Sequence, residues 1–400
     1  MNHRISTPAL YQQSITTLQS KQASLARLQQ QLTTGSKLLT AKDDPVGAGA
    51  AVALDRALAE LEQFGANGDV VRHRLGLQEN ALTQAGDVLR RINTLTVQAN
   101  GGTLSDSDRR DIAIEVARLR DTLLDLANTP DGTGRYLFGG TRDGNPPFAA
   151  GAGGVAYAGD QTRRSVEIGP EMFVDDALPG SEIFMRVRVG DGRIDAAADP
   201  ANAGSGVVTG ASVTDSTAWS GVGHRIVFAA GGAYSIEDAA GTVLGGGLHA
   251  PGEAIDFGGT RLVLSGTPAD GDTFSIAPAG TRDVFATIDG LLDALGMDPT
   301  TDAQRTVQQN ALQGALRDIA TAQQHFIDAR ADGGSRLAAL DQADDLRAAH
   351  GLTIESTLSG LRDLDYAEAI ARFDLEKVAL EAAQLSFMQM QRMSLFNLIR

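Results

Sequence analysis

The stretch VRHRLGLQENALTQAGDVLRRINTLTVQA, residues 71–99, decides the architecture of this 400-residue chain. Within it, mostly apolar residues recur in alternating steps of four and three. The nine positions are Val71, Leu75, Gln78, Leu82, Ala85, Leu89, Ile92, Thr96 and Ala99. Only Gln78 and Thr96 among them are polar. This spacing predicts a helix whose apolar seam lies along another helix.

Similar stripes on both sides of this segment predict further helices, including one at each end of the chain. One stripe comprises Ile15, Leu18, Leu25 and Leu32, a second runs from Ile112 to Leu126, and a third from Leu312 to Leu340. A last helix is predicted from Asp365 to the chain end. It has two apolar lines: Ile370, Phe373, Leu380 and Phe387 in one, and Leu375, Val378, Ala382 and Leu385 in the other. Terminal helices usually fray, so these stripes need partners: each other, the rest of the chain, or neighbouring subunits.

The middle of the chain has a different pattern. Of the 46 glycines, 28 lie between residues 139 and 282, which argues against long helices there. Short apolar or alternating runs between turn residues predict strands at 184–189, 224–228, 261–264 and 273–276, with a hairpin around 269–272. The predicted fold class is therefore multi-domain α+β. Both chain ends form a long antiparallel helical bundle or coiled coil, and a β-rich insert lies between them.

The composition excludes several classes of protein. A formal charge of −16 argues against a nucleic-acid partner, because phosphate binding needs a basic patch. The chain has no cysteine, which removes disulfides and thiolate metal sites. No run of about 18 apolar residues exists to span a membrane. The first residues lack the apolar core of a cleaved signal peptide, so export would need another route.

No motif in the sequence predicts an enzyme, a cofactor or a metal site. The six histidines never fall at i, i+4 spacing on a predicted helix, and His-Glu-x-x-His is absent. The Gly-rich runs near residues 151–154 and 245–247 do not join a strand to a helix as phosphate-binding loops do. No Gly-x-Ser-x-Gly elbow occurs. We therefore expect no catalytic residues, no cofactor and no metal.

Several short segments together resemble the bacterial flagellin family, and within it the distal hook–filament junction proteins. They are MNHRIST at 1–7, TGSKLLTAKDDP at 34–45, YLFGG at 136–140, LRDLDYAEAI at 361–370 and SLFNL at 394–398. The resemblance covers about the first 140 and the last 120 residues, and the middle insert has none. The start, Pro45 after the paired aspartates, and the Ser-Leu-Phe ending favour a junction protein over filament flagellin.

The resemblance implies a structural protein of the flagellum that takes part in motility. Such a protein is exported unfolded by the flagellar type III apparatus, without a cleaved signal peptide, and is located outside the cell. Its implied partners are flagellin, the hook-proximal junction protein, further copies of itself in a ring, and an export chaperone. Its implied domains are an inner-tube domain (1–42 and 362–400, disordered in the monomer), a helical rod (43–140 and 283–361) and a β-rich surface domain (141–282).

The candidate site is an assembly interface on the terminal helices, which the stripes and the resemblance together indicate. Its predicted residues are Ile15, Leu18, Leu25, Leu32, Ile370, Phe373, Leu380, Phe387, Met390 and Leu395. The methionines near the C-terminus fit either ordinary helix packing or an interface that adapts to unlike neighbours. Asp43, Asp44 and Pro45 predict a capped turn. By the family parallel, this turn is a hinge between the inner-tube helix and the outer domain.

Three alternatives stay open at this point. The chain could be the filament flagellin itself, which differs from a junction protein in copy number and self-polymerisation. An enzyme could be held in the insert, although its sequence displays no catalytic group. The two ends could also simply pair in a monomeric coiled-coil bundle, in which case protease-resistant termini would be expected.

Overall fold

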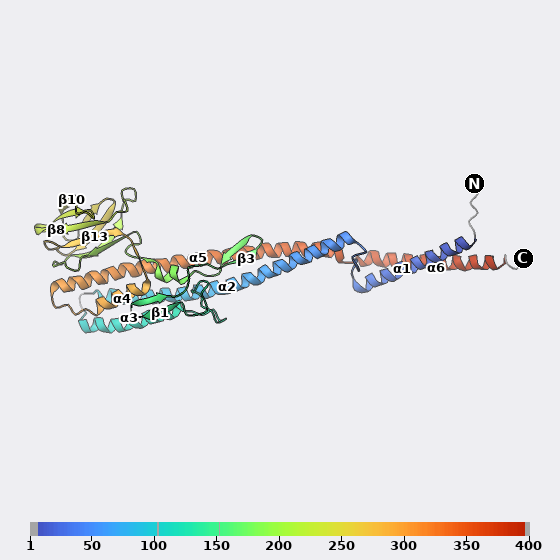
Figure 1. The fold of residues 1–400 in the computed structure, drawn as a ribbon, viewed down its shortest axis with the longest axis horizontal. Coiled ribbons are helices and arrows are strands. Elements are labelled where there is room, and N and C mark those ends of the chain that lie inside the picture. The colour runs from blue at the N-terminus through green and yellow to red at the C-terminus, as the bar shows by residue number, and fades with distance from the viewer. Residues whose placement is uncertain (1–6, 102–103, 152, 397–400) are drawn as a thin grey trace. The chain divides into compact units, whose positions relative to one another are not determined.

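The computed structural model describes residues 7–101, 104–151 and 153–396 (Figure 1). The chain divides into two compact units, which are described separately. One unit consists of both chain ends, up to Gly65 and from Asp344, and the other of Ala66–Ala343. Helices from both ends flank a β-rich middle, which confirms the predicted fold class.

The described residues of the chain-end unit are helical apart from two turns. It contains α1 (Thr7–Thr34), the beginning of α2 (Pro45–Ala99), the end of α5 (Asp302–Arg362) and α6 (Tyr366–Phe396). The turn after α1 lies against the turn before α6. The Lys37 N–H donates to the Arg362 carbonyl at 2.7 Å, and the Leu364 N–H donates to the Gly35 carbonyl at 3.0 Å. Gly35 ends α1 with a φ of 69°, a conformation that favours glycine, and the Tyr366 hydroxyl lies directly over it.

The helices of the second unit pack around one large aliphatic and aromatic core and, between α2 and α5, a second, smaller one. They are the rest of α2 and α5, with α3 (Asp106–Ala127) and α4 (Val284–Leu295). Ser105 and Asp108 form a capping box at the start of α3. The seam predicted on α2 is buried here: Leu82, Leu89 and Ile92 have no exposed surface. Its two polar members have partners, since Gln78 accepts from the Leu178 N–H at 2.8 Å and Thr96 donates to the Ile92 carbonyl at 2.7 Å.

Two small hairpins and a π-helical turn complete the helical part of this unit. The hairpins are β1 (Phe148–Gly151) with β2 (Gly154–Tyr157), and β3 (Ser165–Gly169) with β4 (Met172–Asp175). The second hairpin packs Ile168 and Val174 against apolar residues of α2 and α5. The strand predicted at 184–189 is wrong over its first half. Residues Ser181–Met185 form the π-helical turn, because Phe184 is buried among the aromatic rings of the helical core.

Residues 194–278 form a two-sheet sandwich, which we call the outer module. One sheet has the strand order β10-β9-β8-β13-β6 and the other β11-β12-β7. In chain order the strands are β6 (Ile194–Ala198), β7 (Val207–Val213), β8 (His224–Phe228), β9 (Ala233–Glu237), β10 (Val243–Leu248), β11 (Ala254–Phe257), β12 (Thr260–Ser265) and β13 (Thr273–Pro278). The strands predicted at 224–228, 261–264 and 273–276 are confirmed as β8, β12 and β13.

The hairpin predicted around residues 269–272 is wrong. That turn carries the chain from β12 in one sheet to β13 in the other, so the two strands do not pair. Buried Asp272 shapes it by accepting from the N–H groups of Ala203, Gly204 and Ala269. The outer module joins the helical part through two short paired strands, β5 (Val187–Arg188) and β14 (Thr281–Arg282), which we call the neck.

Candidate assembly interface

The two terminal helices pair with each other through a narrow, mixed interface. The rings of Tyr11 on α1 and Phe387 on α6 lie 5.1 Å apart. Lys21 on α1 forms an ion pair with Glu376 on α6 at 2.9 Å. A shallow crevice between the helices is lined by Gln13, Ser14, Thr17, Leu18, Ala383, Ser386, Phe387 and Met390. This face of α6 is therefore used within the chain.

The predicted interface residues differ in how far they are covered. Leu18, Phe387 and Met390 meet at the crevice between α1 and α6. Half-buried side chains elsewhere on the two helices are those of Ile15, Leu25, Leu32, Phe373 and Leu380. Ile370, by contrast, is 51% exposed. The Leu395 side chain lies outside the described residues. Of the ten predicted residues, three thus lie at the crevice between the two helices.

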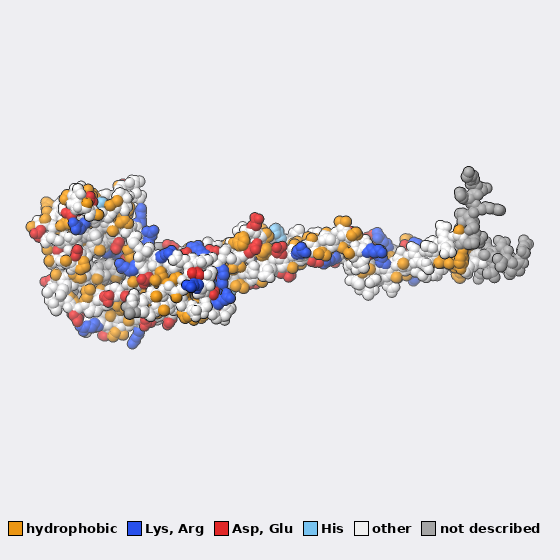
Figure 2. Space-filling view, viewed as in Figure 1, with side chains coloured by type: hydrophobic (Ala, Val, Ile, Leu, Met, Phe, Trp, Pro, Cys, Tyr) orange, Lys and Arg blue, Asp and Glu red, His pale blue; other side chains and the backbone are white. Residues whose placement is uncertain are grey.

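A second apolar line on α6 is uncovered. We call Leu375, Val378, Leu385 and Met388 the outer line of α6, and all four are at least half exposed, with Leu375 at 70%. The sequence showed most of this line, but the predicted interface did not include it. The sequence did indicate an uncovered line, because α6 carries two apolar lines and α1 has only one narrow apolar stripe to cover them. Figure 2 shows hydrophobic side chains on the described surface of the two terminal helices.

The unit of the chain ends has little core of its own. All three clusters of buried apolar residues among the described residues lie within Ala66–Ala343. Among the described residues, 21 large apolar side chains are exposed, and 11 of them belong to the chain ends: Tyr11, Val46, Val52, Leu346, Leu352, Tyr366, Ile370, Leu375, Val378, Leu385 and Met388. That excess is notable because this unit has 122 of the 400 residues (65 up to Gly65 and 57 from Asp344). Large exposed apolar side chains are therefore concentrated in the chain ends.

The residues of the predicted hinge lie in a capped turn between α1 and α2. Asp44 accepts from the N–H groups of Val46 and Gly47, so it caps α2, and Pro45 occupies the first helical position. Asp43 accepts from the N–H groups of Leu39 and Thr40 and pairs with Arg27. Desolvation acts to raise the pKa of Asp43, but the Thr40 amide and the Arg27 guanidinium outweigh it, so the pKa lies below its usual range. That this turn acts as a hinge between the inner-tube helix and the outer domain stays a prediction.

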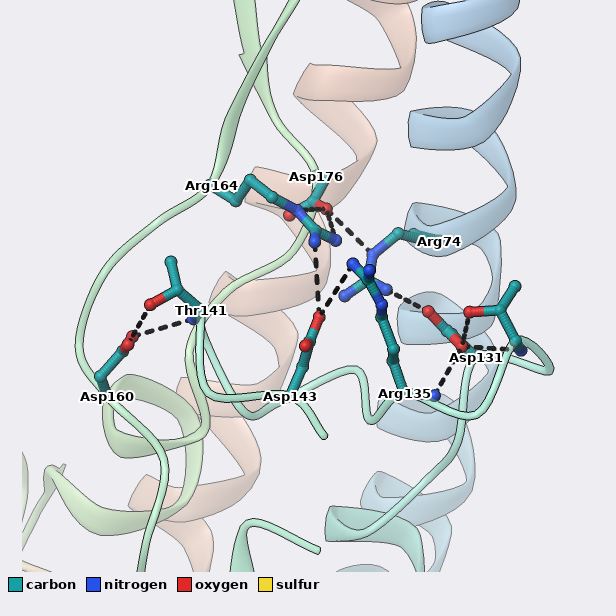
Figure 3. A network of polar contacts seen from close by, with 9 residues as sticks. Arg74, Asp131, Arg135, Thr141, Asp143, Asp160, Arg164 and Asp176 are labelled. Carbon is teal, nitrogen blue, oxygen red and sulfur yellow. Dashed lines mark hydrogen bonds and ion pairs between the residues drawn. The ribbon is translucent and has the colours of Figure 1, made fainter. Parts of the chain in front are cut away.

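A buried ion network fixes the segment after α3 onto α2 (Figure 3). Arg74, which is 4% exposed, pairs with Asp131 and, at 3.0 Å, with Asp176. Arg164 donates to Asp176 at 2.6 Å and lies 3.4 Å from Asp143. Desolvation acts to raise the pKa of Asp131, yet hydrogen bonds from Thr133 and the charge of Arg74 lower it overall. At the centre of the network, Arg74, Asp131 and Asp176 are buried, so their charges balance one another within the fold.

The part of the chain that the structure describes contains neither a metal-binding cluster nor a membrane-spanning helix. No three histidine, aspartate or glutamate side chains there are arranged to hold a metal ion. Among the helices described, none is both long and apolar enough to cross a membrane.

Comparison with known proteins decides the family. Residues 5–143 match the family of the bacterial flagellin N-terminal helical region. The crystal structure of Xanthomonas campestris FlgL is 47% identical in sequence, with a TM-score of 0.71, over 76% of this chain and 99% of that one. The chain belongs to the FlgL branch of the bacterial flagellin family.

Further FlgL-type proteins are similar over most or all of this chain. The flagellar junction protein FlgL of Legionella pneumophila is 27% identical with a TM-score of 0.70, over 78% of this chain and all of that one. Flagellar hook-associated protein 3 of Escherichia coli strain K12 is 25% identical over 397 residues, which is 99% of each chain. The similarity to FlgL proteins therefore includes the outer module and both terminal helices, and is not confined to the flagellin-like ends.

Proposed function

We propose that this chain is a structural adaptor at the hook–filament junction of the bacterial flagellum, with no catalytic activity. The observation that carries this proposal is the similarity along the whole chain to hook-associated protein 3. The adaptor joins the hook-proximal junction protein on one side to flagellin on the other, and further copies of the chain lie beside it in a ring. Its place is outside the cell, on the flagellum.

We propose coupled folding and assembly as its mechanism. The chain passes unfolded through the flagellar type III export apparatus, without a cleaved signal peptide and with the help of an export chaperone. The termini stay mobile in the monomer and become ordered when they bury apolar surface against neighbouring subunits. Two features of the described chain ends support this mechanism: they contribute no buried apolar cluster, and they expose many apolar side chains. Amphipathic helices gain most of their stability from packing, so these helices need a partner.

We propose that the two faces of α6 have different roles in this interface. Leu18, Phe387 and Met390 hold α1 against α6, and the outer line of α6 is the surface left for a neighbouring subunit. The capped turn at Asp43, Asp44 and Pro45 then connects the inner-tube part to the rest of the molecule. We propose three domains: an inner tube at 1–42 and 362–400, a helical rod at 43–140 and 283–361, and a surface domain at 141–282.

The alternative function is that of the filament subunit, since the family that matches residues 5–143 is named for flagellin. A clean deletion of the gene distinguishes the two. We expect hooks without filaments by electron microscopy, and flagellin monomers released into the medium. Loss of flagellin from both cells and medium would identify the chain as the filament subunit. Normal filaments in the deletion strain would contradict both functions, provided that no second gene copy is present.

A further inference from the structure

The outer module and the helical part of its unit do not share an apolar core. The buried cluster of the outer module is built from its own strands, such as Ile194, Leu262 and Phe274. Among the described residues, α4 and α5 contribute nothing to it. The helical core likewise takes no residue from β6 to β13. What holds the outer module on α5 must therefore be something other than apolar packing.

Asn310 on α5 binds the free edge of β7 as a neighbouring strand would. The Val208 N–H donates to its Oδ1 at 2.9 Å, and its Nδ2 donates to the Gly206 carbonyl at 2.9 Å. One carboxamide thus supplies both the acceptor and the donor that a paired strand would offer. β7 lies at the end of its three-stranded sheet, so this edge has no strand partner.

Arg317, two helical turns further along α5, binds both sheets at once. Its Nη1 donates to the Val208 carbonyl on β7 at 3.0 Å, and its Nη2 donates to the Ala196 carbonyl on β6 at 2.8 Å. β6 is the end strand of the five-stranded sheet. Burial lowers the pKa of the Arg317 guanidinium, and Asp195 and Asp318 act in the opposite direction. A single side chain therefore joins the two sheet edges to the helix.

The next residues of α5 bind the loop that leads from the neck into the outer module. The Gly190 N–H donates to Asp318 Oδ1 at 2.7 Å, and Thr321 donates to the Gly190 carbonyl at 2.6 Å. Asp318 also pairs with Arg282 of the neck at 3.0 Å. Gly190 has a φ of 66°, which favours glycine, so the loop turns sharply at this point. Asn310, Arg317, Asp318 and Thr321 make up what we call the latch.

A cavity lies beside the latch, between the helices and the sheet edges. Its volume is about 290 Å³, and it is lined by residues of β6, α4 and α5, including Ala197, Gly290, Asn310 and Gly314. Many of the lining side chains are small. The contact between the outer module and α5 therefore combines the latch hydrogen bonds with a cavity that the small side chains leave unfilled.

We propose that the outer module is a separately folded body, held by the latch, that opens from α5 about the neck while both parts stay folded. Opening exchanges the latch hydrogen bonds for bonds to water and leaves the apolar core of each part intact, so its free-energy cost is small compared with unfolding. The covalent connection is confined to the two neck segments, where β5 and β14 pair over two residues. This proposal does not depend on the junction role.

The test is hydrogen exchange of the full-length chain, comparing the wild type with the double variant Asn310→Ala, Arg317→Ala. We expect peptides that contain the Gly190 and Val208 amides to exchange about tenfold faster in the variant, because those amides donate to the latch. Peptides from β8 and from the seam of α2 should keep their exchange rates. The control is Arg305→Ala on the same helix, because Arg305 forms an exposed ion pair with Asp302 on α5 and is not part of the latch. Unchanged exchange at Gly190 and Val208 would overturn the proposal.

A second measurement separates opening from unfolding. Trp219 is the only tryptophan of the chain and packs against the core of the outer module. Its fluorescence follows the outer module in urea, while the ellipticity at 222 nm follows the helices. We expect two transitions that do not coincide, and a Trp219 midpoint that the double variant leaves in place. A Trp219 midpoint that falls to lower urea in the variant would show that the outer module needs the latch to fold, which contradicts the proposal. If the double variant does not fold, Asn310→Asp serves instead, because it keeps the acceptor for Val208 and loses the donor to Gly206.

Discussion

At the scale of single residues, the buried arginine of α2 neutralises two buried carboxylates. Arg74 faces two carboxylates, and none of the three side chains is more than 5% exposed. Replacing it with methionine keeps most of the volume but leaves Asp131 and Asp176 without their buried cation. We expect Arg74→Met to lower the free energy of unfolding by about 3–5 kcal/mol. Urea denaturation followed at 222 nm measures this.

The matched control for that prediction is Arg90→Met on the same helix. Arg90 is 69% exposed at its side chain and pairs with Asp87, three residues earlier. An exposed pair of this kind contributes at most about 1 kcal/mol. Equal losses for Arg74→Met and Arg90→Met would show that the network of Figure 3 adds nothing beyond an ordinary surface pair.

His249 of the outer module has an imidazole ring with buried nitrogens. Both ring nitrogens of His249 are buried and lack a hydrogen-bond partner among the described residues, and the ring packs edge-on against Phe228. Burial lowers the pKa of His249, and the charge of Glu253 offsets this in part. Because the folded pKa lies below the unfolded value of about 6.5, the folded state binds the proton less well. Stability is therefore intact above that value and falls as the pH drops below it.

We accordingly expect the urea midpoint of Trp219 fluorescence to be lower at pH 5 than at pH 7.5. The variant His249→Phe removes the titrating group and keeps an aromatic ring against Phe228. It should lose a measurable part of that pH dependence. The same pH dependence in the variant and the wild type would assign the acid sensitivity to other groups of the outer module.

At the scale of elements, α6 offers one face to α1 and another to solvent. Asp substitutions on the outer line should block assembly without disturbing the monomer, because a carboxylate is costly to bury in an apolar interface. We expect Val378→Asp with Leu385→Asp to reduce the fraction of cells with filaments at least about tenfold in a complementation assay. Circular dichroism of the purified variant should match the wild type.

The control for α6 is Gln384→Asp, at an exposed position outside the outer line. Each Asp costs the helix at most about 0.7 kcal/mol in intrinsic propensity, so the control separates that cost from the loss of an interface. Normal filaments with the double variant would show that neighbouring subunits bind elsewhere.

The periodicity of α6 predicted both apolar lines, but it could not predict which line faces α1. Both lines have similar composition and spacing, and the choice depends on particular contacts such as the ring pair of Tyr11 and Phe387. The predicted interface therefore combined residues that the structure covers with Ile370, which it leaves exposed. Spacing alone reveals an amphipathic face, whereas the partner of that face is set by tertiary packing.

At the scale of the whole molecule, the three-part division followed from local pattern, and the topology of the insert did not. Helical seams repeat over many turns, so the sequence pattern indicates them clearly. In the insert, β13 pairs with β6 and β8, strands far before it in the chain, while its sequence neighbour β12 lies in the other sheet. Such non-local pairing leaves no periodic signal. The latch was missed for the same reason, since Asn310 and Arg317 bind backbone groups about 100 residues away.

The distribution of buried apolar residues between the two units predicts how the isolated chain exchanges its amide hydrogens. Helices without a core open readily, so the amides of α1 and α6 should exchange at least about a hundredfold faster than those around Leu82 and Leu89 in α2. Exchange mass spectrometry of the purified monomer tests this, and the wild-type peptides around Leu82 provide the internal standard. If α1 and α6 were as protected as the α2 seam, the paired ends would already form a stable bundle in the monomer. Coupled folding on assembly would then have no free energy left to gain, and the monomeric coiled coil would be the better description of the chain ends.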